Sequence, residues 1–310
     1  MTGWHTYFPH ATFILRTILL LTGVGLLSFF SVLERIDAVF YDKISTIQQY
    51  LPDNNIVIVA IDEESLQTLG RWPWSRSLHA KLINRLQKTG SNVIGLDILF
   101  SEPQNDPFAD GNAERIYLVE PLPFFRENAR LGHVDIELDS DGIARRVFLK
   151  AGIEEPSWPA FGFALATQSN KYMTDWAGDI NETPANARGR WVRSHEALIP
   201  YAGQPGSFQQ LSYTQVLFDD QVLASLKDKI IIVGMTATGM GMRFATPASP
   251  LNRQPMSGVE WHANVLNMLL HDRAIHPVAD HSISLISIIW VLTALLAVSI
   301  LQRNITIPFL

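Results

Sequence analysis

Two aspartates stand at the ends of apolar runs, where they could bind a ligand or take part in catalysis. Asp62 follows the run IVIVAI, and Asp97 interrupts the run NVIGLDILF. Continuous apolar runs of this length are typical of strands buried on both faces, as in a parallel sheet. Because α/β sheets bind ligands where the carboxyl ends of parallel strands meet, we expect both carboxylates at that carboxyl edge.

The same acids allow a second interpretation. Asp62, Asp97 and Glu102 could together hold a hard cation, which prefers oxygen ligands. The alternative is structural: the three carboxylates cap helices and pair with Arg71 or Arg76.

A glycine-rich loop is predicted to reach the same edge. The run KDKIIIVGM predicts a third buried strand, which is followed by GMTATGMGMRFATP. The loop lacks the Lys-Ser/Thr ending of a P-loop and does not fit the dinucleotide-binding glycine pattern. Its backbone N–H groups could instead line a concavity. We therefore include Thr236, Thr238 and Arg243 among the candidate ligand-binding residues.

Trp72 and Trp74 flank Pro73, so their rings could stack together on a ligand. The chain holds eight Trp, which favours packing as the role of this pair. Arg76, just beyond it, is a further ligand-binding candidate beside Asp62, Asp97 and Glu102.

The stretch GHVDIELDSDGIARRVFLK predicts a hairpin of two strands that turns at Asp139–Gly142. With Gly142 as the sixth residue of a calcium-binding loop, the twelfth would be Phe148 instead of a glutamate, so the calcium interpretation fails. No G-x-S-x-G, H-E-x-x-H or cysteine is present. Covalent hydrolysis and a zinc-protease site therefore have no support.

The positioning elements form a strand–helix–strand unit followed by further helices and strands. Ser75 begins a predicted amphipathic helix that stops at Gly90, and PSWPAFGFALATQ predicts a helix over 156–170. A polar loop then leads to a short edge strand, ALIPY, and SYTQVL begins another helix. The expected fold is α/β, with a mixed, mainly parallel sheet and flanking helices.

The segment 257–275 predicts a last amphipathic helix. Glu260, His262 and Asn264 lie on it, and we list them as candidate signal-relay residues. For His262 the structural alternative is a buried, hydrogen-bonded histidine of the core.

Two uncharged apolar runs predict that this domain is inserted between two transmembrane helices. We place the helices at 13–33 and 282–301 and the domain at 36–280, since a span needs about 20 apolar residues. A cleavable signal peptide is the alternative for the first run, but no small-x-small site follows it. Two spans put both termini on one side. The net charge of −6 and the lack of a basic cluster argue against nucleic acid as a partner.

Five separated motifs resemble the type-two CHASE domain, the extracytoplasmic sensor of bacterial receptors with cyclase or kinase outputs. They are VIVAIDEESLQTLGRWPWSRSLHAKLINRL, VIGLDILFSEP, DSDGIARRV, KDKIIIVGMTATGMGMRFATP and SGVEWHANVLNMLL. The resemblance covers residues 36–277 and implies a periplasmic, non-enzymatic sensor in a bacterial inner membrane, with cytoplasmic termini. It also implies an unknown extracytoplasmic ligand, contact with membrane lipid, a homodimer, and an output cyclase or kinase; it implies no cofactor and no metal.

The chain departs from the family pattern in three places. The segment 110–121 is short, Arg243 stands where relatives tend to have an acid, and the sequence stops at ITIPFL after the second apolar run. From the last feature we expect either a receptor fragment or a module that borrows its output. A membrane-anchored, metal-dependent enzyme using Asp62 and Asp97, and a scaffold without a ligand, are the alternative functions.

Overall fold

The computed structural model describes residues 32–48, 50–98, 129–169, 189–249 and 255–276, and the helical positions 289, 290, 292, 293 and 296. The chain divides into two compact units, residues 44–277 and residues 1–43 with 278–310. The two predicted membrane spans, 13–33 and 282–301, lie almost wholly outside the described residues, as do Glu102 and the short segment 110–121. Within the described part of the chain, no helix is long and apolar enough to cross a membrane.

The larger unit is built around a parallel sheet of strand order β2-β7-β1-β6. Both central strands are almost free of solvent exposure, which is why their sequences are unbroken apolar runs. The predicted parallel sheet and α/β fold are confirmed. The four strands are β1 (Ile56–Ile61), β2 (Val93–Asp97), β6 (Gln209–Ser212) and β7 (Ile230–Met235).

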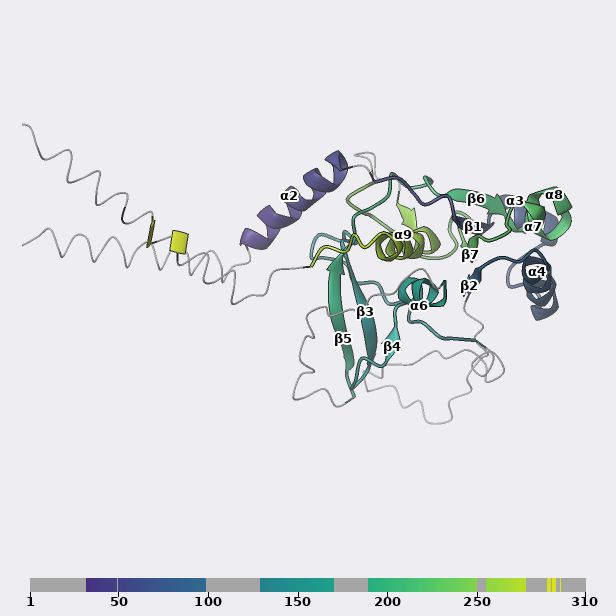
Figure 1. Ribbon diagram of the computed structural model, residues 1–310, viewed down its shortest axis with the longest axis horizontal. Helices are drawn as coiled ribbons and strands as arrows, with labels where there is room; N and C mark the ends of the chain where they lie inside the picture. Colours follow the sequence, from purple (N-terminus) through teal and green to yellow (C-terminus); the bar gives the residue numbers. More distant parts are fainter. Residues whose placement is uncertain are drawn as a thin grey trace, which may run out of the picture. The chain divides into compact units, whose positions relative to one another are not determined.

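Four helices cover one face of this sheet (Figure 1). Leu82 and Leu86 of α4 pack there with Val216 and Leu217 of α7 against alternate residues of β1 and β7. This face holds one of the two hydrophobic clusters that the described residues form. The helices are α3 (Glu63–Leu69), α4 (Arg76–Lys88), α7 (Tyr213–Phe218) and α8 (Asp220–Ala224).

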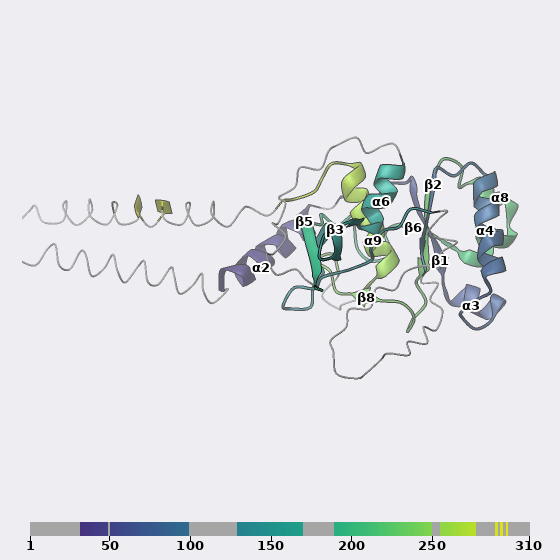
Figure 2. The ribbon, with the colours of Figure 1, turned by 90° about the horizontal axis from the view of Figure 1, so that it is seen from below.

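The opposite face carries two helices and, beyond them, an antiparallel sheet of order β4-β3-β5 (Figures 1 and 2). One cluster joins Ile56 and Ile232 of the parallel sheet, Val265 of α9 and Leu149 of β3. The larger unit is therefore layered. The elements are α6 (Phe161–Gln168), α9 (Gly258–Leu270), β3 (Arg146–Ile153), β4 (Trp158–Pro159) and β5 (Trp191–Leu198).

Two short strands precede α9. β8 (Arg243–Phe244) and β9 (Met256–Ser257) form an antiparallel pair that leads into α9. The helix α2 (Val32–Ile47) has 16 residues. It begins in the smaller unit and ends in the larger one.

The structure corrects three local predictions. The turn at Asp139–Gly142 exists, but residues 134–138 form no strand, so the predicted hairpin is wrong; β3 pairs with β5 instead. Of the predicted edge strand ALIPY, only Ala197 and Leu198 are in a strand, Trp191–Leu198, which begins in the segment we expected to be a loop. The helix predicted over 156–170 is only Phe161–Gln168, because the segment with its two prolines first forms β4.

Candidate functional site

Asp62 ends β1 and begins α3, which places its carboxylate at the carboxyl edge of the sheet. Its Oδ1 accepts hydrogen bonds from Ser65 N at 2.8 Å, Ser65 Oγ at 2.6 Å and Ser212 Oγ at 3.0 Å. The bond from Ser65 N is an N-cap, which satisfies a backbone donor of the first helical turn. Ser212 ends the neighbouring strand β6, so this carboxylate ties two adjacent strand ends together.

The hydroxyl groups around Asp62 form a connected network. Ser65 and Ser212 are buried, and their Oγ atoms lie 2.9 Å apart. Ser212 also shares a hydrogen bond of 2.9 Å with Thr214 Oγ1. The hydrogen bonds described for Asp62 all use its Oδ1 atom.

The glycine-rich loop follows β7 onto the same edge. The N–H groups of Thr236 and Ala237 both donate to Ile61 O at 3.1 Å, so the loop begins directly against the end of β1. Thr238 N then donates to the Glu63 carboxylate at 2.7 Å. The hydrogen bonds from Thr238 lower the pKa of Glu63, and the nearby Arg243 guanidinium acts in the same direction.

Arg243 closes this loop from its far end. Its guanidinium donates to Thr236 O and, at 3.4 Å, to Pro255 O. The side chain thus bridges the first residue of the loop to the segment that enters β9. Arg243 therefore has a structural role, which is to join the two ends of the loop.

Asp97 ends β2 and lies opposite Gly234 of β7 in the sheet register. Burial raises the pKa of Asp97 to about 6. No hydrogen bond or ion pair of its carboxylate is found among the described residues. A Cβ on Gly234 would lie 3.3 Å from Asp97 Cβ and 2.7 Å from Val259 Cβ, so glycine is needed for α9 to approach this edge.

Asp62 and Asp97 lie on the two strands that flank β7, and Glu102, the third acid of the predicted cation set, lies outside the described residues. β7 lies between the strands that carry them, which separates their backbones by about 9–10 Å. Among the described residues, no group of three His, Asp or Glu side chains could hold a metal ion.

The tryptophan pair lies on the helix-covered face beside this edge. Trp74 is buried, donates from Nε1 to Gly70 O at 2.9 Å, and packs its ring 4.9 Å from that of Tyr213. The Trp72 ring contacts the Trp74 ring edge-on at 5.3 Å. These contacts favour packing over ligand stacking. Arg76 is exposed at the start of α4.

The three predicted relay residues of α9 are buried. Glu260 accepts from the N–H groups of Gly206 and Ser207 at 2.7 and 3.2 Å, and Asn264 Oδ1 accepts from Ala202 N at 2.8 Å. Both side chains hold the loop that leads from β5 to β6. His262 instead contacts the Phe161 ring of α6 at 5.2 Å, and burial lowers its pKa to about 3.

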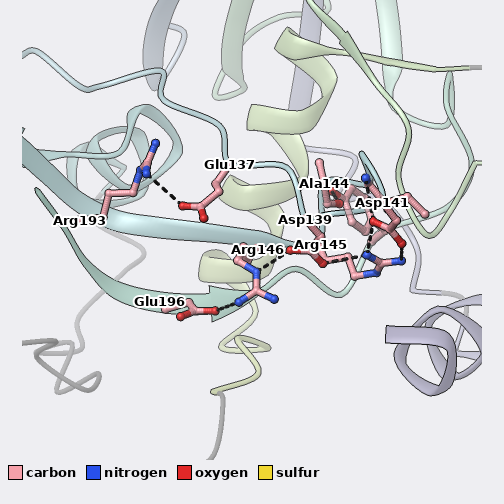
Figure 3. A network of polar contacts seen from close by, with 10 residues as sticks. Glu137, Asp139, Asp141, Ala144, Arg145, Arg146, Arg193 and Glu196 are labelled. Carbon is pink, nitrogen blue, oxygen red and sulfur yellow. Dashed lines mark hydrogen bonds and ion pairs between the residues drawn. The ribbon is translucent and has the colours of Figure 1, made fainter. Parts of the chain in front are cut away.

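The acidic turn binds arginines (Figure 3). Buried Arg145 donates to Asp139 at 2.8 Å and to Asp141 at 2.7 Å, while Arg146 joins Asp139 to Glu196 of β5. Farther along, Arg193 pairs with Asp135 and Glu137. The carboxylates are neutralised within the chain, which explains the residues of the turn without a bound cation.

Sequence reasoning overlooked several residues of the edge. Glu63, Ser65 and Ser212 hold the strand ends and the loop together, yet none was singled out. One signal was available: Ser212 and Gln215 form a capping box, whose S-x-x-Q spacing marks the start of α7.

A family model, the CHASE2 domain, matches residues 15–301. The chain belongs to the CHASE2 domain family. This family comprises extracytoplasmic sensory domains of signalling receptors. No curated protein and no solved structure matches the chain.

Proposed function

We propose that residues 36–280 are the extracytoplasmic sensor of a bacterial signal-transduction receptor, anchored by the apolar segments 13–33 and 282–301. The observation that carries this proposal is the CHASE2 match, which extends over both apolar segments and the domain between them. In this account the domain senses a ligand and passes the signal through the membrane helices to a cytoplasmic cyclase or kinase. Termini in the cytoplasm and a homodimer belong to the same proposal.

The carboxyl edge is the proposed ligand site. Three strand ends meet there, and they present the Asp62 carboxylate, the Asp97 carboxyl group and the loop from Thr236 to Arg243. Asp62 Oδ2 and Asp97 have no arginine or lysine partner among the described residues. Hydrogen-bond acceptors at both positions favour a ligand that carries hydrogen-bond donors.

The site supports sensing better than catalysis. Asp62 is held by a cap and two hydroxyl groups, and no hydrogen bond joins it to Asp97, which lies two strands away, among the described residues. Contacts to α9 through Gly234 instead offer a way for a change at the edge to move a helix. We therefore propose a module that binds without turnover.

The proposal is tested by joining residues 1–310 to the catalytic domain of a diguanylate cyclase and measuring cyclic dinucleotide in cells. Asp62→Asn and Asp97→Asn should each change the output severalfold at equal protein level. Glu64→Gln is the matched control, because Glu64 is an exposed neighbour on the first turn of α3. If both variants produce the same cyclic dinucleotide output as Glu64→Gln, the carboxyl edge is not a sensing site.

A further inference from the structure

Asp53 connects the start of β1 to the end of α9. Its N–H donates to Asn267 Oδ1 at 3.0 Å, and its carboxylate lies 3.4 Å from His271 Nε2. The same residue also fixes the start of the strand, since Asn55 N donates to Asp53 Oδ1 at 2.8 Å and Ile56 N donates to Asp53 O at 3.0 Å. One residue therefore bonds to the helix and to the strand.

β1 and α9 run side by side in opposite directions. The six residues of β1 and the thirteen residues of α9 each span about 20 Å. At the carboxyl edge, Val259 near the start of α9 packs against Gly234, which pairs with Ala60 of β1. At the other end, Asn267 meets Asp53. β1 and α9 thus both run between the carboxyl edge and the region around Asp53.

The start of α9 is joined directly to the glycine-rich loop. Gly258 N donates to Met242 O at 2.9 Å, and Arg243 lies in the strand pair that leads into the helix. The loop is therefore bonded both to the start of α9 and, through Ile61 O, to the end of β1, which Asp62 also joins to α3.

The chain segments next to Asp53 and α9 lead toward the other unit. The Arg273 guanidinium lies over the Tyr50 ring at 4.7 Å from its centre. Ile275 and Leu198 of β5 exchange two backbone hydrogen bonds, of 2.8 and 3.4 Å. The segment that enters the domain and the segment that leaves it are thus tied together and to the antiparallel sheet.

We propose that Tyr50, Asp53, Asn267, His271 and Arg273 form an exit clamp that couples the carboxyl edge to the two segments leading to the membrane. Asp53 is its positioning residue, because it alone among these five bonds to both β1 and α9. When α9 shifts relative to β1, the clamp passes this movement to the segment that follows α9. That segment then moves relative to the segment that precedes β1. This inference rests on the proposed sensor function and names the relay within it.

The test is hydrogen exchange of the full chain in lipid nanodiscs, with Asp62→Asn as the perturbation at the carboxyl edge. The amides of 53–56 and 267–275 should exchange roughly tenfold faster in Asp62→Asn, although they lie at the other ends of β1 and α9. Asp62→Asn is then combined with Asn267→Ala and His271→Ala, which together remove the bonds of the clamp to Asp53. A second combination pairs Asp62→Asn with Arg273→Ala, which removes only the contact with Tyr50. In these combinations, Asp62→Asn should no longer speed the amide exchange of residues 267–275.

Two comparisons keep the outcome unambiguous. Amides of β7 report global stability, so an effect that appears there equally is unfolding and contradicts the clamp. Asp272→Asn is the matched control, since it lies between His271 and Arg273 and its side chain is exposed; it should leave the remote response intact. A response confined to the carboxyl edge, or one that survives opening of the clamp, overturns the inference. If the reporter fusion still responds to Asp62→Asn in that case, the sensor proposal stands without the clamp.

Discussion

Asp62 and Ser212 end two adjacent parallel strands and are joined by a hydrogen bond of 3.0 Å from Ser212 Oγ to Asp62 Oδ1. The bond links the N-terminus of α3 to the strand that leads into α7. It joins the ends of β1 and β6 and the starts of α3 and α7 into one hydrogen-bonded set at the carboxyl edge.

Asp62→Ala should lower the free energy of unfolding by about 1–2 kcal/mol, since it removes an N-cap and leaves two buried hydroxyl groups without their acceptor. Denaturant unfolding of the full chain in detergent measures the loss. Glu64→Ala, an exposed substitution in the same turn, should change the free energy by less than about 0.5 kcal/mol. Equal losses in the two variants would mean that the hydroxyl network is not maintained in solution.

The contact between Glu63 and Thr238 should make the loop sensitive to acid. The pKa of Glu63 in the folded chain lies below its ordinary value of 4.5, so its contribution is complete above that value. It is lost as the pH falls through the lowered pKa. Amide exchange at Thr238, corrected for intrinsic rates, should therefore rise below pH 4.5. In Glu63→Gln this additional rise should disappear; a rise that persists in Glu63→Gln would assign the effect to another group.

Gly234→Ala should destabilise the chain by about 1–3 kcal/mol, because the new methyl group would overlap the Val259 side chain at 2.7 Å. The substitution should also loosen α9 from β7, which is visible as faster exchange along the helix. Gly258→Ala is the matched control: its nearest neighbour is Met242 O at 3.6 Å, an ordinary contact. Similar losses in both variants would contradict close packing at this edge.

Asp139→Asn should cost about 2–3 kcal/mol, since buried Arg145 and half-buried Arg146 both lose a charged partner (Figure 3). Asp220→Asn breaks another ion pair of the chain, that with Arg85. Its side chain is 87% exposed, so the loss there should stay below about 0.5 kcal/mol. Thermal unfolding of the two variants side by side measures the difference. A small loss for Asp139→Asn would mean that water replaces the carboxylate at Arg145.

The fold could be predicted from the sequence where strands are buried on both faces. The runs IVIVAI and KDKIIIVGM predicted β1 and β7 correctly. The ends of these runs also predicted that Asp62 and the glycine-rich loop lie at the same edge of the sheet. β6 was missed because the edge strand QQLS has a single large apolar residue. Its pairing with β1 depends on tertiary contacts that no local pattern shows.

The wrong hairpin prediction has a physical cause. Residues 134–138 alternate like a strand, but Asp135 and Glu137 bond to Arg193 through side chains instead of joining a backbone ladder. Alternation alone does not distinguish these two arrangements. The edge contacts of Glu63 and Ser65 were unpredictable for a similar reason, since they depend on where Thr238 and Ser212 arrive from distant parts of the chain.

The side of the membrane on which the domain lies tests the central claim most directly. The chain has no cysteine, so Asp220→Cys places a single thiol at a side chain that is 87% exposed. A membrane-impermeant maleimide is applied to cells with an intact inner membrane, and to lysed cells for comparison. The account predicts full labelling before lysis. Labelling that appears only after lysis would place the domain in the cytoplasm and contradict an extracytoplasmic sensor.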